Sequence, residues 1–534
     1  MSGVQIRLAA LLLRDHYGEI VEKVGTYLIK HGARPLRLIA QENAVKLDQV
    51  RKALCVLIQH NIVKFAVNKR GFVEYQADVK KVLLHTRYPK YIYCAKTLYG
   101  DAGEIIVEEL LQNGQMLMSA AVRRVTERLN EAIEDNQKIE ESYVRGKFID
   151  LINTHFLQRV ASPPADTGSS QPPVPNLVIN EQDLYKIPVC MTVGGSSLQT
   201  QKRKRSVDEG SDNPRKRQRT DSTMSEDLEA APDDGIYWSV NYDRFHQHIR
   251  DQIIIESVAV RVDKIAAEVV RTMLRMSEVT TDPKATLTTP ISSHEIFHAL
   301  PKELKLPRQT FDQYLKLLND DRSEFISKNS ESGGGMYVIN IYKAIKTQCT
   351  AHVESVIQER FGSKCYRIFR LLLLKKHLEQ KQVEEFAMIP AKEAKELLYR
   401  MFSDHIVALQ EIPRTPDHAP SRTIYLFSVN LNEVSRMLLE RCYKAQTNMI
   451  ARREHDNDEN KRLLEKSLKV EAISASLQNS GANADQAAEV EEMITPAERV
   501  QLNKLKNTFK KLEQTELQLD ETVFILNSFV DMVV

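Results

Sequence analysis

The sequence contains one short motif that could carry out chemistry by itself, His294-Glu295-Ile296-Phe297-His298. This HExxH pattern places two imidazoles one helical turn apart, where they can hold zinc while the glutamate activates water. No glycine and third histidine follow at the spacing of the longer zinc-protease motif, and Pro301 cuts the predicted helix short. We therefore interpret the match at His294, Glu295 and His298 as accidental, and we expect no metal and no cofactor.

Other catalytic signatures are missing from the sequence. The Ser-Gly-Gly-Gly run at 332–335 is not a phosphate-binding loop, because no Gly-Lys-Ser/Thr follows it, and we interpret it as the mobile tip of a hairpin. There is no GxSxG, no CxxC and no carboxylate pair placed for acid–base chemistry. The six cysteines are widely spaced, which argues against zinc ribbons and against a secreted disulfide framework.

Binding, rather than catalysis, is the chemistry that the charged residues suggest. Lysine and arginine number 74 against 72 aspartates and glutamates, so any contact with nucleic acid must come from local patches. The first set of candidates lies on a predicted hairpin, and the second alternates with tyrosines that could stack on unpaired bases. A tyrosine cluster facing the core is the alternative that we favour for the second set. The candidates are Lys64, Lys69 and Arg70 in the first set, and Arg87, Lys90 and Lys96 in the second.

Two further basic clusters lie nine residues apart, in a stretch from 193 to 234 that is poor in apolar residues and is predicted to be disordered. Residues 202–219 carry eight basic and three acidic side chains, which favours a bipartite nuclear-localisation signal over a merely solvated charge run. Ser206 precedes an acidic pair and is a candidate phosphorylation site, where a phosphate would subtract up to about two charges. The candidate signal residues are Lys202, Arg203, Lys204, Arg205, Arg215, Lys216, Arg217 and Arg219.

The element that positions the first set of basic residues is the stretch from 36 to 77. A short helix, a turn at 43–46 and a second helix with an apolar stripe are followed by two strands that flank Asn68-Lys69-Arg70-Gly71. This order is the layout of a winged helix, which can read DNA or dock proteins. The second helix offers Asp48, Gln49, Arg51 and Lys52 to a base edge, a thin set for a sequence reader.

The same plan recurs along the chain, although sequence identity among the copies is negligible. We predict a mainly helical protein with small β wings: four tandem extended winged-helix domains and a C-terminal antiparallel coiled-coil hairpin. Thr495-Pro496-Ala497-Glu498 reads as a capping box at the start of the hairpin's second arm. The predicted boundaries are 1–80, 81–160 (with a wing that extends to 188 if 177–188 supplies its return strand), a disordered linker at 161–235, 236–342, 343–429 and 430–534.

The N-terminal apolar run is interrupted by charged residues, and no segment has the roughly 20 apolar residues that span a bilayer. We therefore expect a soluble, intracellular protein.

Several stretches together resemble one family, the large winged-helix subunit of RNA polymerase III. They include LDQVRKALCVLIQHNIV, RYPKYIY, DDGIYW, VVRTMLRMSE, SGGGMYVIN and TPDHAPSRTIYLF. The resemblance covers essentially the whole chain, and only residues 161–235 match poorly. It implies four extended winged-helix domains around a coiled coil, and a relation to general transcription factor IIE.

The resemblance also implies a function without catalysis. Such a subunit docks on the polymerase clamp with a small acidic-tailed subunit and a second winged-helix subunit. It assists recruitment to the promoter-bound initiation factor and promoter opening for small RNAs such as tRNA and 5S rRNA. It further implies a part in cytosolic DNA sensing. We expect DNA contact that is weak, largely independent of sequence and able to include single strands, and a location in the nucleus and, for the sensing role, in the cytosol. The alternatives are a stand-alone winged-helix transcription factor and a zinc hydrolase.

Overall fold

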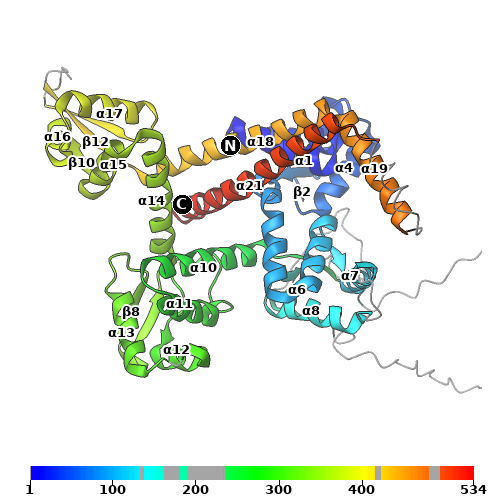
Figure 1. The fold of residues 1–534 in the computed structure, drawn as a ribbon, viewed down its shortest axis with the longest axis horizontal. Coiled ribbons are helices and arrows are strands. Elements are labelled where there is room, and N and C mark those ends of the chain that lie inside the picture. The colour runs from blue at the N-terminus through cyan, green and yellow to red at the C-terminus, as the bar shows by residue number, and fades with distance from the viewer. Residues whose placement is uncertain are drawn as a thin grey trace, which may run out of the picture. The chain divides into compact units, whose positions relative to one another are not determined.

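The computed structural model describes residues 2–132, 138–161, 181–188, 233, 235–304, 306–414, 416, 422–479 and 493–533. The chain forms two compact units: Pro89–Phe245 is one, and Met1–Tyr88 together with His246–Val534 is the other. The described residues contain four antiparallel sheets of three strands each. The predicted class, mainly helical with small β wings and a C-terminal helical hairpin, is confirmed (Figure 1). None of the described helices combines the length and apolar composition that a bilayer-spanning segment needs.

The first winged unit follows the predicted order closely. Its second motif helix, α4, buries Val50, Ala53, Leu54 and Leu57, the spacing expected for one face of a helix. The backbone N–H of Asn68 donates to Phe72 O over 2.8 Å, and Gly71 takes a φ of 78° in the turn between the two wing strands. The elements are α1 (Gly3–Tyr17), α2 (Glu19–His31), β1 (Arg34–Pro35), α3 (Leu36–Glu42), α4 (Leu47–Gln59), β2 (Val63–Val67), β3 (Val73–Ala77), α5 (Val79–Leu83) and the 3₁₀ helix η1 (Leu84–Arg87).

The second winged unit corrects our expectation for its wing. Residues 181–188 contain a 3₁₀ turn and do not return the wing; β6 instead pairs with both β4 and β5, with Trp238 opposite Arg159. Residues 237–240, which the predicted boundary at 236 placed in the third unit, therefore close the sheet of the second. Gly100, with a φ of 77° and a non-helical backbone, divides α6 into two helical segments, the second of which begins beside Asp101. The elements are α6 (Tyr88–Asn113), β4 (Met116–Leu117), α7 (Met118–Ala132), α8 (Glu141–Asn153), β5 (Leu157–Arg159), η2 (Glu181–Asp183) and β6 (Tyr237–Val240).

In the third winged unit, the helical stretch after β6 is divided into two helices, which end and begin on either side of Asp263. Asp263 has an extended backbone and caps α11 by accepting from the N–H of Lys264. The glycine tip of the hairpin is also not free, because Ser293 Oγ donates to Gly334 O over 3.1 Å. The elements are α10 (Tyr242–Arg261), α11 (Lys264–Ser277), β7 (Ile291–Ser292), α12 (Ser293–Ala299), η3 (Lys302–Leu304), α13 (Arg308–Asn319), β8 (Ile326–Ser330), η4 (Ser332–Gly334) and β9 (Met336–Ile339).

The fourth winged unit follows directly and matches the predicted order of helices and strands. Its wing is the longest in the described chain, with β11 and β12 in register from Ala408 opposite Ser428 to Pro413 opposite Thr423. The elements are α14 (Ile341–Phe361), α15 (Ser363–Lys375), β10 (His377–Glu379), α16 (Gln380–Ala387), α17 (Ala391–Ser403), β11 (Ala408–Pro413) and β12 (Thr423–Ser428).

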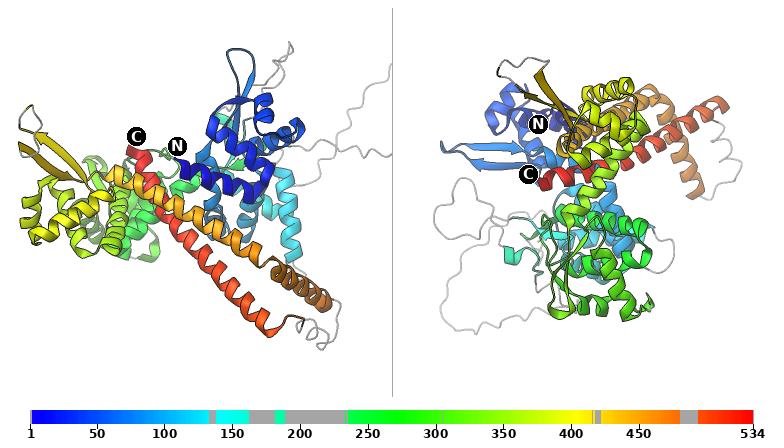
Figure 2. Two further views of the ribbon diagram at one scale, coloured as in Figure 1. Left: turned by 90° about the horizontal axis from the view of Figure 1, so that it is seen from above. Right: turned by 90° about the vertical axis from the view of Figure 1, so that its left-hand side faces the viewer.

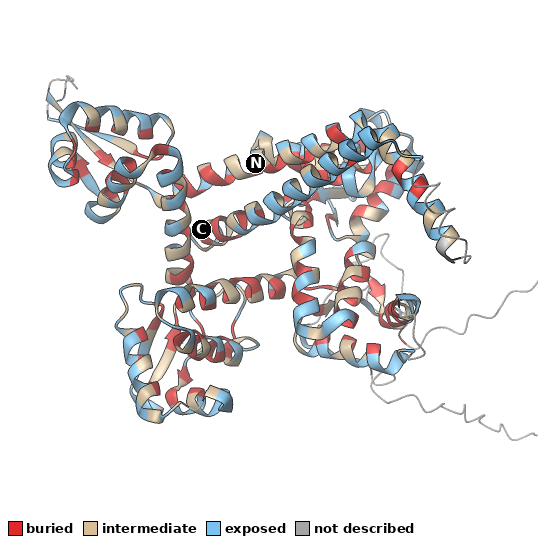
Figure 3. Ribbon diagram, in the orientation of Figure 1, coloured by how far each residue is buried: buried red, intermediate tan, exposed pale blue. Residues whose placement is uncertain are grey.

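The hairpin consists of α18 (Leu431–Glu459) and α19 (Lys461–Asn479) in one arm and α21 (Pro496–Val533) in the other. The predicted capping box is present, since the N–H of Thr495 donates to Glu498 and the N–H of Glu498 donates to Thr495 Oγ1. α21 lies beside α18 (Figure 2) and also packs against α14. Buried residues lie along α18 and are concentrated in the last third of α21 (Figure 3).

Candidate nucleic-acid interface

The first wing presents three cations, Lys69 and Arg70 in its turn and Lys64 on β2 opposite Gln76. Lys64, Lys69 and Arg70 are all exposed, and none of them forms an ion pair with another described residue. Asn68 holds the turn, because its Oδ1 accepts from the N–H of Lys69 and its Nδ2 donates to Glu74 Oε1 over 2.6 Å. Cations without carboxylate partners can neutralise phosphates, so this wing is a candidate surface for a nucleic-acid backbone.

An exposed aromatic residue accompanies these cations and was missed in the sequence. Phe72, directly after Gly71, is 66% exposed at the end of the turn. The alternation of the hairpin predicts which side a strand residue takes, but it does not show how far a turn residue projects. An aromatic face beside cations can stack on a base while the cations hold the backbone.

The helix α4 is a poor reader of base edges. Asp48, Gln49, Arg51 and Lys52 are all exposed, as a recognition helix requires. Lys52 Nζ lies 3.3 Å from Asp48 on the next turn, so one of the few candidate donors is paired within the helix. Aspartate also repels phosphates, which weakens the helix further as a DNA contact.

Arg87, a sequence candidate for nucleic-acid binding, is removed from that role by its burial. Its Nε lies 3.0 Å from Asp520 Oδ2 and its Nη2 lies 3.0 Å from Oδ1, and the two residues are 6% and 2% exposed. The guanidinium carbon stands 4.8 Å from the centre of the Phe524 ring, and Nη1 lies 3.2 Å from His246 Nε2. Arg87 thus ties η1 to the hairpin arm α21. No sequence signal pointed to Asp520 as its partner, because the two lie far apart in the chain.

The aromatic residues that follow Arg87 face the core in part. Tyr91 is fully buried, with its ring 5.2 Å from that of Phe245, and Tyr93 is exposed. Lys90 is half-buried, and Lys96 is paired with Glu104 over 2.7 Å. These lysines therefore offer less free charge than the first wing does, and the structure favours the first set of candidates over the second.

A cluster of aromatic and imidazole rings in the first unit surrounds His85. Its Nδ1 donates to Val82 O over 2.8 Å and its Nε2 accepts from the Tyr17 hydroxyl over 2.8 Å, while Tyr88 stacks on the ring. Burial lowers the pKa of His85 to about 3 and that of the nearby His60 to about 4. Burial, reinforced by Arg87, also lowers the pKa of His246 to about 3. These imidazoles are neutral packing groups and not exposed cations.

The HExxH match lies on α12, where its residues do not converge. Glu295 is the third residue of a capping box: its N–H donates to Ser292 Oγ over 3.2 Å, and its carboxylate accepts from the N–H of Ser292. His294 and His298 are exposed on the same short helix. Among the described residues, no group of three or more histidine, cysteine, aspartate or glutamate side chains is arranged so that it could hold a metal ion.

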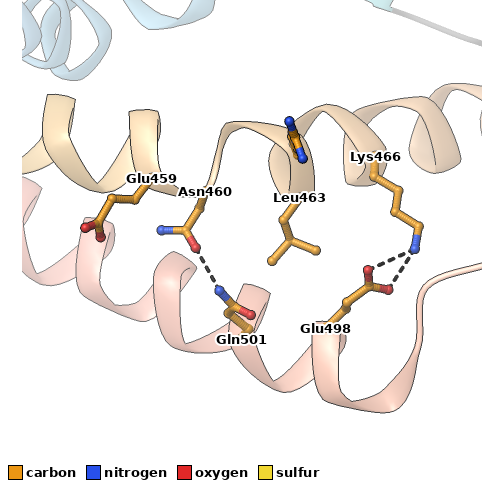
Figure 4. A pocket seen from close by; sticks show the side chains of 7 residues that line it. Glu459, Asn460, Leu463, Lys466, Glu498 and Gln501 are labelled. Atoms are coloured by element: carbon orange, nitrogen blue, oxygen red, sulfur yellow. Dashed lines mark hydrogen bonds and ion pairs between the residues drawn. The ribbon is translucent and has the colours of Figure 1, made fainter.

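A polar pocket of about 270 Å³ lies at the joint of the hairpin, where α18 gives way to α19 (Figure 4). Gln501 Nε2 donates to Asn460 Oδ1 over 2.8 Å, and Lys466 Nζ contacts the Glu498 carboxylate over 2.8 Å. The hydrogen bond from Lys466 helps to lower the pKa of Glu498 to about 2. Every polar group named here holds the two arms together, so we assign the pocket a structural role. The nuclear-localisation candidates and Ser206 lie outside the described residues.

Comparison with known proteins bears on the whole chain. Family models match residues 7–68 as an RNA polymerase III subunit RPC82 helix-turn-helix domain and 146–347 as RNA polymerase III subunit RPC82. Residues 353–429 match the POLR3C C-terminal winged-helix domain, and 462–525 match the helical hairpin domain of DNA-directed RNA polymerase III subunit RPC3.

Full-length relatives agree with these models. The chain is 56% identical to DNA-directed RNA polymerase III subunit RPC3 of Rattus norvegicus and 54% identical to that of Homo sapiens, over 99% of both chains in each case. It is 49% identical to the Danio rerio protein, again over 99% of both chains. The chain therefore belongs to the RPC3 family of DNA-directed RNA polymerase III subunits, which the family models describe as RPC82.

Proposed function

We propose that this chain works as a non-catalytic, nuclear subunit of RNA polymerase III, assembled with the other subunits of that enzyme. The observation that carries the proposal is the match to RPC3 proteins along the full length, at 54–56% identity for the mammalian relatives. The described residues add four winged units and a hairpin, an architecture whose faces can bind other macromolecules.

The finer part of the proposal concerns partners. We place the chain on the clamp of the polymerase, with a small acidic-tailed subunit and a second winged-helix subunit. There it assists recruitment to the promoter-bound initiation factor and promoter opening for small RNAs such as tRNA and 5S rRNA. A part in sensing cytosolic DNA would follow from the same assembly. The support is the resemblance of the chain to this family.

Affinity purification of a tagged full-length chain tests the assembly. Polymerase III subunits should co-purify in equal amounts, with the small subunits retained after a moderate salt wash. Recovery of the chain alone, bound to one preferred duplex site, would favour a stand-alone transcription factor. For nuclear import, deletion of 202–219 should leave the chain in the cytoplasm if it is produced without its partners.

DNA contact is proposed at the first wing. Binding of the isolated chain should be weak, indifferent to sequence and strongly dependent on salt, since it rests on Lys64, Lys69 and Arg70. Replacing all three by alanine should lower the slope of log affinity against log salt by up to about 3 on duplex DNA. The matched control replaces the exposed Lys381, Lys392 and Lys395 of the fourth unit. Equal losses in the two triple variants would refute the assignment to the wing.

A further inference from the structure

The fourth winged unit exposes several large apolar side chains. Three of them lie near the ends of α15 and α16: Leu374 is 69% exposed, Phe386 is 50% exposed and Met388 is 86% exposed. We call these three residues the α15–α16 patch. Single exposed apolar residues are ordinary on protein surfaces, but a cluster marks an interaction site.

Contacts between the two helices bring the patch together. Arg367, Leu371 and Leu374 lie on one face of α15 because they are spaced by four and three residues. Arg367 Nη1 donates to Ala387 O over 2.9 Å, and Lys375 Nζ stands 5.8 Å from the centre of the Phe386 ring. The C-terminal end of α16 therefore lies along this face of α15, with Met388 next in the chain.

Met388 opposes local stability in two ways. Its φ of 54° lies in the left-handed region, which glycine adopts at lower cost than methionine. Its side chain also projects into solvent, where it contributes no packing. A position at which conformation and burial both disfavour the residue is where a binding role is expected. Methionine suits such a role because its flexible thioether adapts to partner surfaces.

The rim of the patch is positive. Arg367, Lys375 and Lys376 are exposed, and none of them forms an ion pair with another described residue. One exposed carboxylate, Glu385, lies beside Phe386, and Glu384 is engaged by Gln380 over 2.8 Å. A partner that covers this patch must match three cations around an apolar centre, which requires acidic groups beside apolar side chains.

We propose that the α15–α16 patch docks an acidic amphipathic segment of a partner protein, which inserts apolar side chains against Leu374, Phe386 and Met388. The carboxylates of that segment face Arg367, Lys375 and Lys376. Nucleic acid fits less well, because two of the three central side chains are aliphatic or thioether groups that can neither pair with phosphate nor offer a flat ring to a base. The site goes beyond the proposed polymerase assembly by naming the face and the chemistry of one contact.

Titration of the full-length chain with two labelled helical peptides tests the chemistry directly. Both peptides carry leucines along one face; the other face is glutamate in the first and lysine in the second. Fluorescence anisotropy should show at least tenfold tighter binding of the glutamate peptide. Met388→Gly should weaken that binding at least fivefold while leaving the thermal midpoint unchanged or raised. Equal binding of the two peptides, or no effect of the variant, would overturn the proposal.

Charge reversal sharpens the assignment. Lys375→Glu with Lys376→Glu should reduce binding of the glutamate peptide and increase binding of the lysine peptide. The control is Leu317→Ser, on a leucine of α13 in the third unit that is 52% exposed, and it should change the binding of neither peptide.

A photo-cross-linking amino acid in place of Met388 tests which molecule covers the patch in the assembled polymerase. This experiment rests on the proposed function. Cross-links should reach one protein subunit, within a segment rich in aspartate or glutamate. Cross-links to DNA alone, or to a basic segment, would refute the docking surface and leave the polymerase assignment intact. If the tagged chain brings down no polymerase at all, the proposed function fails, and the peptide titration then decides the docking surface by itself.

Discussion

The first and second winged units close the same kind of sheet by different means. In the first unit, β2 and β3 are joined by the short turn around Gly71, and the whole wing lies within one stretch of chain. In the second unit, β5 ends at Arg159, and its partner β6 begins at Tyr237, beyond the long segment that includes both basic clusters. One wing is specified by neighbours in sequence, and the other is specified by packing.

The anchors of the two units differ accordingly. In the second unit, Trp238 is fully buried, with its ring edge-on to Phe148 and Arg159 over its face. Asp233, just before β6, accepts hydrogen bonds from the N–H and hydroxyl of Ser119 at the start of α7. The first unit instead depends on the hairpin, through the buried Arg87–Asp520 pair. A strand that returns from far away needs side-chain anchors, because no turn holds it in place.

Removing the anchor of the second wing should have the largest effect. Trp238→Ala leaves a cavity at a fully buried site and should destabilise the Pro89–Phe245 unit by about 3–5 kcal/mol. Hydrogen exchange should then rise in β5 and β6 while β2 and β3 stay protected. The matched variant Tyr75→Ala, on a half-buried residue of the first wing, should have a smaller effect. An equal rise in hydrogen exchange in both wings would show that the two units do not unfold independently.

Breaking the contact between the first unit and the hairpin should have the second-largest effect on stability. Asp520→Ala leaves the Arg87 charge buried without its partner and should cost about 3–5 kcal/mol, and replacing both residues by leucine should restore most of it. The control Asp531→Ala breaks the exposed Lys80–Asp531 pair, for which about 0–1 kcal/mol is expected. Trp238, the sole tryptophan, reports on the second unit by fluorescence, which should be unaffected by Asp520→Ala.

Lowering the pH should destabilise the larger unit more than the smaller one, and this effect should be smaller than those of the two substitutions above. His60, His85 and His246 lie in the larger unit and have pKa values near 4, 3 and 3, below the ordinary value of 6.5. The unfolded chain therefore binds more protons below pH 6.5, so the stability present above that pH is lost as it falls towards 4. Each histidine contributes up to about 1.4 kcal/mol per pH unit.

Thermal unfolding followed by hydrogen exchange at pH 7, 6 and 5 measures this loss. His60→Gln should flatten the pH dependence of the larger unit, and His294→Gln, on an exposed residue, should leave it unchanged. A constant midpoint from pH 7 to 5 in the unaltered chain would contradict the assignment of these imidazoles as neutral and buried.

Cutting the chain between the two strands of the second wing should have the smallest effect. A protease site engineered between 189 and 232 should be cleaved without separating the fragments, because β5–β6 pairing, the Asp233–Ser119 contacts and the Arg87–Asp520 pair all join residues on opposite sides of the cut. The fragments should elute together in gel filtration under native conditions and apart in denaturant. When the cut is combined with Trp238→Ala, the fragments should stay together through the Arg87–Asp520 pair, but hydrogen exchange in β5 and β6 should rise further than with either change alone. Loss of hydrogen-exchange protection in β6 after cleavage alone would mean that packing does not hold this wing.

The candidate interface was predictable only where residues act locally. Lys64, Lys69 and Arg70 sit on a hairpin that turn residues and alternation specify, and the structure leaves all three exposed. Arg87 could not be judged from its neighbours, because its basic and aromatic surroundings suit both a binding surface and a buried pair. Asp520 and Phe524 decide between these possibilities, and they come from the last helix of the chain.

The amino-acid sequence by itself determined the helices, the local hairpins, the capping box at Thr495 and the family. These features depend on periodicity, turn chemistry and residue identity within short windows. Tertiary structure alone decided the return strand of the second wing, the burial of Arg87 and the docking of the glycine tip onto α12. Each of these is a contact between segments that are distant in the chain. Such a contact forms because burial and hydrogen bonding outweigh the entropy of closing a long loop, and no local pattern records that balance.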